Sequence, residues 1–246
     1  MELIYRQTFT VSDLEVDCFG KLTLSSLLFY AQEVAGQHCQ LLGTDYDSLA
    51  KLRMFWAVTR HRVQITRLPL RGEAITVETW PMPTTRVAYP RSTVAYDAQG
   101  KELFRSVSLW VLMDLDSRAM VLPGKSSIAV NGILRGMELD IPHSLIPQPL
   151  SGSREYTVTY SCLDRNGHMN NTKYLDWVAD LLSSRFHEEH SAREFVICYL
   201  SEARECQQIR LDWALSPEGL LQVHAHREKT DVSQKQERVF SAQVLF

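Results

Sequence analysis

The chain repeats one order of predicted elements, and this repeat limits its possible folds more than any other feature. In each half, a segment of alternating apolar and polar residues precedes a helical segment, and four further alternating segments follow. Alternation with a period of two is typical of β-strands, whereas apolar residues at i, i+3, i+4 and i+7 indicate a helix with one buried side. The 246 residues therefore predict two similar units of roughly 120 residues each.

The first unit is predicted over residues 1–122. A strand at residues 2–11 comes first, and a helix of about 20 residues then begins near Thr23 or Ser25 and ends near Gly43. Four antiparallel strands should follow, at residues 56–65, 74–80, 88–96 and 101–114. Residues 123–152 then hold eight prolines and glycines counting from Pro123 to Gly152, which predicts a linker on the surface.

The second unit is predicted over residues 153–246. It opens with a strand at residues 155–161, and a helix follows whose apolar side is formed by Tyr174, Trp177, Val178, Leu181 and Leu182. Either Asn170 or Asn171 is a natural N-cap for this helix. The four remaining strands are expected at residues 194–204, 208–215, 220–229 and 239–246.

The repeat can also be followed at single residues. Asp17 and Gly20 before the first helix match Asp164 and Gly167 before the second at an offset of 147 residues. A long helix with a broad apolar surface needs a curved sheet that wraps around it, which is the hotdog arrangement. We therefore predict an α+β protein with a double hotdog fold, two tandem repeats in one chain.

The polar turn before the second helix is the candidate site. It carries Asn166 and His168, where the first unit has Phe19 and Lys21. An imidazole, an amide and the carboxylate of Asp164 beside the free N–H groups of a helix start can polarise a carbonyl and activate water. Without the histidine, the same residues would indicate only a capped turn. We therefore expect chemistry in the second unit and leave the first free to form a binding pocket.

Composition excludes several other classes of function. The net charge is −3 and no block of lysine and arginine occurs, which argues against nucleic-acid binding. No apolar run approaches the ~18 residues of a membrane-spanning helix, and the first residues lack the pattern of a signal peptide. The five cysteines are scattered without a C-x-x-C motif, so free thiols in a cytoplasmic protein, without a metal or other cofactor, are expected.

Residues 164–177 resemble the signature of the acyl-ACP thioesterases, the family of the plant plastid enzymes and their bacterial relatives. The pattern Asp-x-Asn-x-His-Met-Asn-Asn-x-Lys-Tyr-x-x-Trp is matched at every named position. A second block at residues 200–206 resembles the family's Glu-Cys segment, and the first half resembles it around Gln32–His38 and Thr79–Trp80. The resemblance thus extends over nearly the whole chain.

The resemblance implies hydrolysis of a fatty acyl thioester carried by acyl carrier protein, with release of the fatty acid. Two sets of residues are implied or expected for this reaction. The catalytic group would be Asp164, Asn166, His168 and Glu205, with Cys206 as a nucleophile or as a small residue packed beside the site. The substrate would be bound by Asn170 and Asn171 at the helix start and by Leu27, Leu28 and Ala31 on the first helix.

Some alternatives remain open at this stage. The spacing from His168 leaves Glu202 as a second candidate for the Glu205 role. Rival activities are hydrolysis of acyl-CoA, dehydration of 3-hydroxyacyl thioesters and non-catalytic acyl binding. Lys173, Arg165 and Arg204 are candidates for contacts with acidic acyl carrier protein. The oligomeric state is open, with a homodimer as one arrangement.

Overall fold

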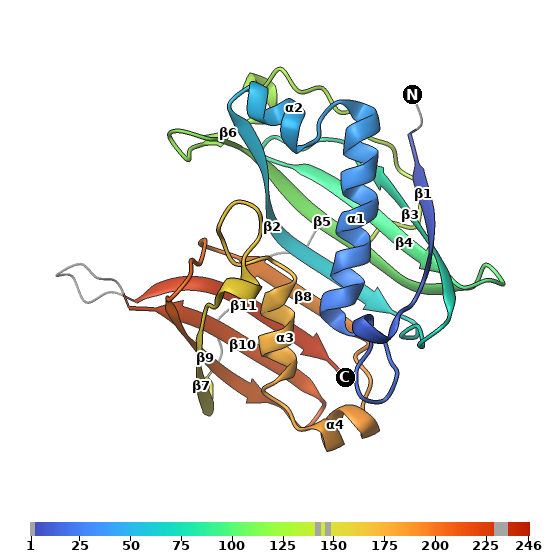
Figure 1. Cartoon of the computed structure of the whole chain (residues 1–246), viewed down its shortest axis with the longest axis vertical. Helices are drawn as coiled ribbons and strands as arrows, with labels where there is room; N and C mark the ends of the chain where they lie inside the picture. Colours follow the sequence, from blue (N-terminus) through green and yellow to red (C-terminus); the bar gives the residue numbers. More distant parts are fainter. Residues whose placement is uncertain (1–2, 141–143, 146–148, 229–235) are drawn as a thin grey trace. The chain divides into compact units, whose positions relative to one another are not determined.

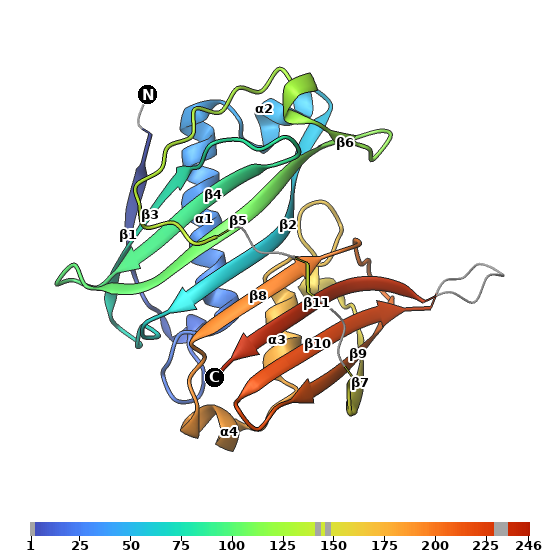
Figure 2. The ribbon, with the colours of Figure 1, turned by 180° about the vertical axis from the view of Figure 1, so that it is seen from behind.

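The computed structural model describes residues 3–140, 144–145, 149–228 and 236–246. The chain forms two compact units, residues 1–142 and residues 143–246, so the division falls within the predicted linker. Each unit contains an antiparallel sheet with a helix packed on one face (Figures 1 and 2). This α+β organisation is the predicted hotdog arrangement, present twice.

The N-terminal unit contains one long helix and one antiparallel sheet. Helix α1 (Leu24–Leu42) begins at Thr23, whose hydroxyl accepts a hydrogen bond from the Ser26 N–H, and ends at Gly43 with φ 67°. Both helix ends were predicted from these capping residues. The antiparallel strands follow the order β1 (Tyr5–Thr10), β3 (Ala74–Pro81), β4 (Tyr89–Tyr96), β5 (Glu102–Asp114) and β2 (Met54–Ile65). The short helix α2 (Tyr46–Lys51) and the strand β6 (Met120–Val121), which pairs with β5, were not predicted.

The sheet of this unit carries several buried polar residues. The register places His61 opposite Ser108, and Ser108 opposite Arg91, on three adjacent strands. The Arg91 side chain donates hydrogen bonds to Thr79 Oγ1 at 3.3 Å and Cys39 Sγ at 3.8 Å, and lies 3.1 Å from His38 Nδ1. Burial lowers the pKa of Arg91, because a guanidinium ion is poorly solvated there.

The N-terminal unit also includes residues 123–140, which were predicted as part of the linker. The Ile133 N–H donates to the Pro81 carbonyl at 2.9 Å, and the Trp80 indole donates to Glu138 at 3.1 Å. A Cβ atom on Gly132 would lie 2.0 Å from the Met82 carbonyl oxygen, so this close passage requires glycine. The glycine and the polar contacts therefore fix this segment against the sheet of its own unit.

The C-terminal unit repeats the plan with shorter helices. Its antiparallel strands follow the order β8 (Glu194–Tyr199), β11 (Glu237–Leu245), β10 (Leu220–Arg227), β9 (Gln208–Leu215) and β7 (Gly152–Thr157). Helix α3 (Lys173–Ala179) packs Tyr174 against Phe240 and Trp177 against Tyr156, with ring centroids 4.8 Å and 5.0 Å apart. A short helix α4 (Ser184–Glu189) follows.

Three predicted elements of this unit have wrong bounds. The strand predicted at residues 155–161 runs over Gly152–Thr157 instead. The second helix ends at Ala179, before Leu181 and Leu182, because the Ser183 hydroxyl accepts a hydrogen bond from the Phe186 N–H and starts α4 instead. The strand predicted at residues 194–204 ends at Tyr199. Residues 200–207 therefore form a loop, and this loop carries part of the candidate site.

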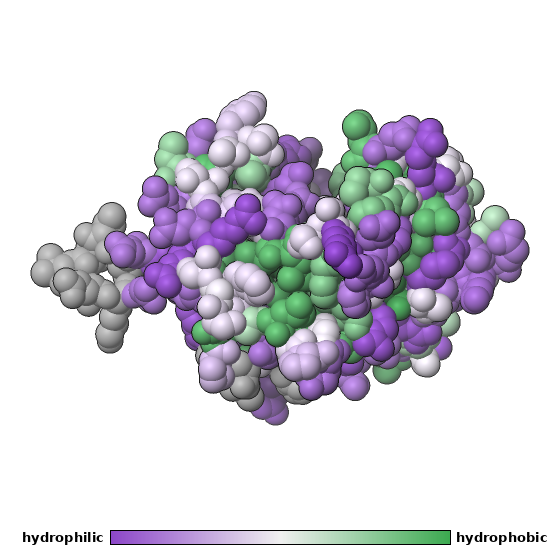
Figure 3. All heavy atoms as spheres, turned by 90° about the horizontal axis from the view of Figure 1, so that it is seen from below, coloured by the Kyte–Doolittle hydropathy of each residue, from purple (hydrophilic) through white to green (hydrophobic). Residues whose placement is uncertain are grey.

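The surface is mainly polar on the side of the molecule that Figure 3 shows, with a smaller apolar area between the polar residues. Within the described residues, no helix is long and apolar enough to cross a membrane.

Candidate active site

The polar turn before α3 is built around the Asp164 carboxylate. Its Oδ1 accepts hydrogen bonds from the N–H groups of Asn166 at 2.8 Å and His168 at 3.1 Å. The Asp164 N–H donates to the His168 carbonyl at 2.7 Å, and Gly167 adopts φ 72°, which favours glycine. Asp164 thus fixes the backbone from which the His168 side chain extends.

The N-terminal unit contains the same turn without the same chemistry. Asp17 Oδ1 accepts hydrogen bonds from the N–H groups of Phe19 and Lys21, both at 2.9 Å, and Gly20 has φ 73°. This equivalence confirms the predicted repeat at the level of single hydrogen bonds. The hydrogen bonds of Asp164 are therefore a feature of the fold, since Asp17 makes them next to a phenylalanine and a lysine.

The loop that faces each turn is equivalent as well. The Leu22 N–H donates to the Pro69 carbonyl, and the Met169 N–H donates to the Ala203 carbonyl, both at 2.8 Å. The residue preceding each acceptor is Leu68 in the N-terminal unit and Glu202 in the C-terminal unit. The pair Lys21 and Leu68 thus corresponds to the pair His168 and Glu202.

The His168 imidazole and the Glu202 carboxylate contact each other in the C-terminal unit. His168 Nε2 lies 3.2 Å from Glu202 Oε2, and the two side chains are 13% and 42% exposed. The mostly buried imidazole is thereby oriented by a carboxylate that water can reach. A carboxylate in this position stabilises the imidazolium that forms when histidine accepts a proton.

The second predicted acidic residue lies elsewhere on the same loop. Glu205 is exposed, and its side chain makes no hydrogen bond or ion pair with a described residue. Cys206, its neighbour, adopts φ 66° and donates its N–H to the Val158 carbonyl at 2.9 Å. Of the two glutamates left open by the sequence, the contact with His168 favours Glu202.

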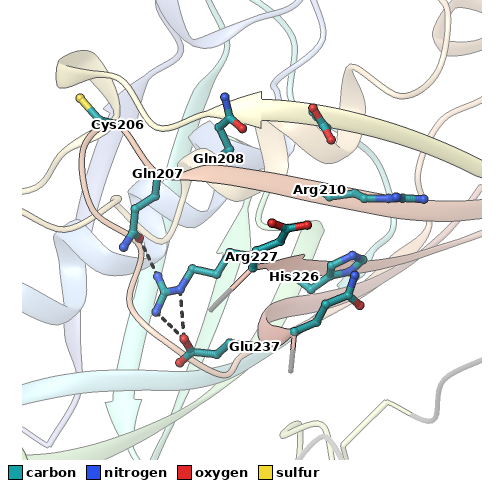
Figure 4. Close-up of a pocket in the computed structure, with 10 residues that line it drawn as sticks. Cys206, Gln207, Gln208, Arg210, His226, Arg227 and Glu237 are labelled. Atoms are coloured by element: carbon teal, nitrogen blue, oxygen red, sulfur yellow. Dashed lines mark hydrogen bonds and ion pairs between the residues drawn. The ribbon is translucent and has the colours of Figure 1, made fainter. Parts of the chain in front are cut away.

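Cys206 is exposed and lines a cleft of about 730 Å³ in the C-terminal unit (Figure 4). The cleft is also lined by Gln207, Arg210 and Arg227, but neither His168 nor Glu202 is among its lining residues. The Cys206 thiol has no hydrogen bond to a described residue. The structure thus brings together His168 and Glu202, and the Cys206 thiol forms no hydrogen bond with either.

The predicted asparagines have different surroundings. Asn166 is exposed, and its amide donates to Asp164 Oδ2 at 3.4 Å. Asn170 Oδ1 accepts hydrogen bonds from both the N–H and the hydroxyl of Thr172, the N-cap residue of α3, at 3.0 Å. The Asn171 carbonyl accepts a hydrogen bond from the Tyr199 hydroxyl at 2.9 Å. Asn170 therefore stabilises the helix start, and of the three, Asn166 presents an amide to solvent.

The predicted acyl-binding residues lie in the N-terminal unit. Leu27, Leu28 and Ala31 are buried on α1, which packs against β1 and β3. They belong to the core of that unit, and their role in acyl binding stays a prediction. Among the described residues, no group of three or more histidines, cysteines or carboxylates could hold a metal ion.

Both halves of the chain match models of known protein families. Residues 2–122 match the model of the acyl-ACP thioesterase N-terminal domain, and residues 148–241 match that of the C-terminal domain. The chain belongs to the acyl-ACP thioesterase family. Among curated relatives, oleoyl-acyl carrier protein thioesterase 1 of Arabidopsis thaliana is 27% identical over 84% of this chain and 61% of its own length. The dodecanoyl-[acyl-carrier-protein] hydrolase of Cinnamomum camphora is 28% identical over 83% of this chain and 56% of its own length.

Solved structures of this acyl-ACP thioesterase family share the fold. The acyl-ACP thioesterase of Bacteroides thetaiotaomicron superposes with a TM-score of 0.88 at 22% identity, covering 99% of this chain and 97% of the other. The 12:0-ACP thioesterase of Umbellularia californica gives a TM-score of 0.83 at 22% identity, covering 100% and 97%. The chain spans about three-fifths of the length of the curated relatives named above.

Proposed function

We propose that this protein hydrolyses fatty acyl thioesters of acyl carrier protein, releasing the free fatty acid and the carrier thiol. The contact between His168, in the turn that carries the family signature, and Glu202, on the loop of residues 200–207, is the observation that supports this activity most directly. Membership of the family supports the acyl carrier protein as the carrier. The acyl chain would bind in the N-terminal unit, where Leu27, Leu28 and Ala31 are buried on α1.

In this mechanism, His168 removes a proton from water while Glu202 stabilises the resulting imidazolium. The hydroxide attacks the thioester carbonyl carbon, and a tetrahedral intermediate with a negative oxygen forms. When the carbon–sulfur bond breaks, the imidazolium returns the proton to the leaving thiolate. General-base help of this kind is typically worth roughly 10²–10⁴ in rate. No covalent enzyme intermediate is needed, so Cys206 is not a nucleophile in this proposal.

The oxyanion needs a hydrogen-bond donor, and the Asn166 amide is the exposed candidate in the turn. One such donor is typically worth about 3 kcal/mol in the transition state. Asp164 contributes by holding the N–H groups of Asn166 and His168, which sets the positions of both side chains.

The first test is a panel of acyl-ACP substrates of increasing chain length, with matched acyl-CoA substrates. We expect hydrolysis of acyl-ACP with a much higher kcat/KM than for the matched acyl-CoA. His168→Ala should lower kcat by about 10²–10⁴-fold, which is the loss of general-base help. A clear preference for acyl-CoA would favour the rival acyl-CoA thioesterase, and unchanged hydrolysis in His168→Ala would remove the mechanism.

Glu202→Gln and Glu205→Gln form a matched pair for the carboxylate. Each removes one negative charge from the same loop, but only Glu202 contacts His168. We therefore expect a large loss of kcat in Glu202→Gln and nearly wild-type kcat in Glu205→Gln. The reverse result would restore the Glu205 assignment. A cytoplasmic location, which the sequence predicts, is part of this proposal.

A further inference from the structure

Glu202 lies in a loop, so its direction depends on contacts from other segments. The loop backbone is held at three consecutive residues. The Glu202 carbonyl accepts a hydrogen bond from Arg227 Nη1 at 2.7 Å, and the Ala203 carbonyl accepts one from the Met169 N–H at 2.8 Å. The Arg204 N–H donates to Gln207 Oε1 at 2.9 Å. These contacts set the backbone from which the Glu202 side chain reaches His168.

The Arg227 side chain supports two of these contacts. It donates to the Glu202 carbonyl directly, and it holds the Gln207 amide oxygen that accepts from the Arg204 N–H. Its Nη1 donates to Gln207 Oε1 at 2.6 Å as well as to the Glu202 carbonyl. The Glu237 carboxylate accepts hydrogen bonds from the Nε and Nη2 groups of Arg227, at 3.1 Å and 3.0 Å. Figure 4 shows Arg227 between Gln207 and Glu237 in the cleft. With a side chain only 17% exposed, Arg227 is held in one place by strands β10 and β11.

The N-terminal unit holds its equivalent loop in a similar way. Arg67 Nη1 donates to the Leu68 carbonyl at 3.3 Å and to Glu73 Oε2 at 2.8 Å, and the Leu70 N–H donates to the same Glu73 oxygen at 2.9 Å. Leu68 corresponds to Glu202, so an arginine contacts the same carbonyl in both units. In the N-terminal unit this contact positions no ionisable side chain, which makes Arg67 an internal control.

We propose that Arg227 is a positioning residue for the reaction, because it holds the Glu202 backbone so that the carboxylate faces His168. This inference rests on the proposed function. Arg227 acts through the loop and does not contact the reacting atoms. Its guanidinium is suited to the task because it can donate to a carbonyl, an amide oxygen and a carboxylate at the same time.

Arg227→Met should lower kcat on acyl-ACP by roughly 10²-fold, the order expected for a shift of about 1 Å in a catalytic group. KM should change much less than kcat, because Arg227 acts through the loop. Arg227→Lys should not restore kcat, since one ammonium group cannot make the contacts to Glu202, Gln207 and Glu237 together. Full rescue by lysine would show that only the charge matters and would overturn the inference.

Two controls separate positioning from general loss of stability. Arg67→Met removes the equivalent contact in the N-terminal unit, and Arg210→Met removes the cleft arginine that pairs with Asp212 at 3.0 Å. Both should keep wild-type kcat. Equal losses of kcat in Arg227→Met and Arg67→Met would overturn the inference. If Arg227→Met does not fold, Gln207→Ala decides the matter, because it removes one acceptor while Arg227 stays in place, and it should still lower kcat.

Hydrogen exchange gives a readout that does not need activity. In Arg227→Met, the Met169 and Arg204 amides should exchange faster than in the wild type, whereas Arg210→Met should leave them unchanged. Unchanged exchange in Arg227→Met would show that Arg227 does not hold the loop. Failure of the wild type to hydrolyse any acyl-ACP would instead count against the proposed function, and faster exchange would still identify Arg227 as the residue that holds the loop.

Discussion

At the residue scale, the two copies of the turn separate what an aspartate does for the fold from what it does for catalysis. Asp17 and Asp164 each accept two backbone hydrogen bonds through Oδ1. Either change, Asp17→Ala or Asp164→Ala, should therefore lower the free energy of unfolding by a similar amount, about 1–2 kcal/mol. Only Asp164→Ala should also lower kcat, because it releases the backbone of His168. Thermal unfolding and kcat on acyl-ACP measure the two effects.

Asparagine at the same position distinguishes a positioning role from a charge role. In Asp164→Asn, the amide oxygen can still accept both backbone hydrogen bonds, while the negative charge is lost. We expect this variant to keep most of its kcat and stability. A loss of kcat as large as in Asp164→Ala would instead mean that the Asp164 charge acts on the reacting groups.

The residues of the turn could be predicted from the sequence, but the acidic residue in contact with His168 is Glu202, which was only the second candidate after Glu205. Asp164, Gly167 and His168 lie within five consecutive residues, and local hydrogen bonds decide their geometry. Glu202 and Glu205 lie on a distant loop whose path depends on contacts with Arg227, Met169 and Val158. Arg227 itself was not predicted, because a single arginine on a strand gives no sign of the loop it contacts.

At the element scale, buried polar residues on the N-terminal sheet should make its stability depend on pH. Burial lowers the pKa of His61 on β2 to about 3, whereas an unfolded histidine titrates near ~6.5. Between these values the unfolded chain binds one more proton than the folded chain, so stability is lost as the pH falls, by up to about 1.4 kcal/mol per pH unit. Denaturant unfolding between pH 4 and 7 should therefore show a flatter pH dependence for His61→Gln than for the wild type. The control is His190→Gln, a substitution at the exposed end of α4. If stability falls equally with pH in His61→Gln and in the wild type, the buried His61 is not neutral in the folded chain.

The first helix and the alternating strands were predicted better than the length of the second helix, and the reason is physical. Alternation along β1 and β10 reflects which side chains face the core, and this is a local property of the sequence. The apolar spacing of Tyr174, Trp177 and Val178 continued to Leu182, yet the helix ended at Ala179 because the Ser183 cap began a new helix. Apolar periodicity indicates burial, and it does not by itself show that the backbone continues as one helix.

At the scale of the whole molecule, charge constrains how the proposed partner can dock. The chain has a net charge of −3 and acyl carrier protein is acidic, so the overall charges repel each other. Docking must then depend on local positive groups. Arg165 and Arg204 are exposed, and they lie in the turn and the loop that carry His168 and Glu202. Arg204 also forms a backbone bridge with His168, which places its residue next to the site.

Arg204→Ala should therefore raise KM for acyl-ACP several-fold at low salt and leave kcat nearly unchanged, because rim charges act mainly on encounter with the partner. The difference from the wild type should shrink as salt rises, since the screening length falls from about 30 Å at 0.01 M to about 8 Å at 0.15 M. Arg185→Ala on α4 removes an equal charge from a helix that follows α3 and should not change KM. If KM for Arg204→Ala equals that of the wild type at low salt, the carrier docks on another surface. A fall in kcat without a change in KM would instead place Arg204 with the residues that hold the Glu202 loop.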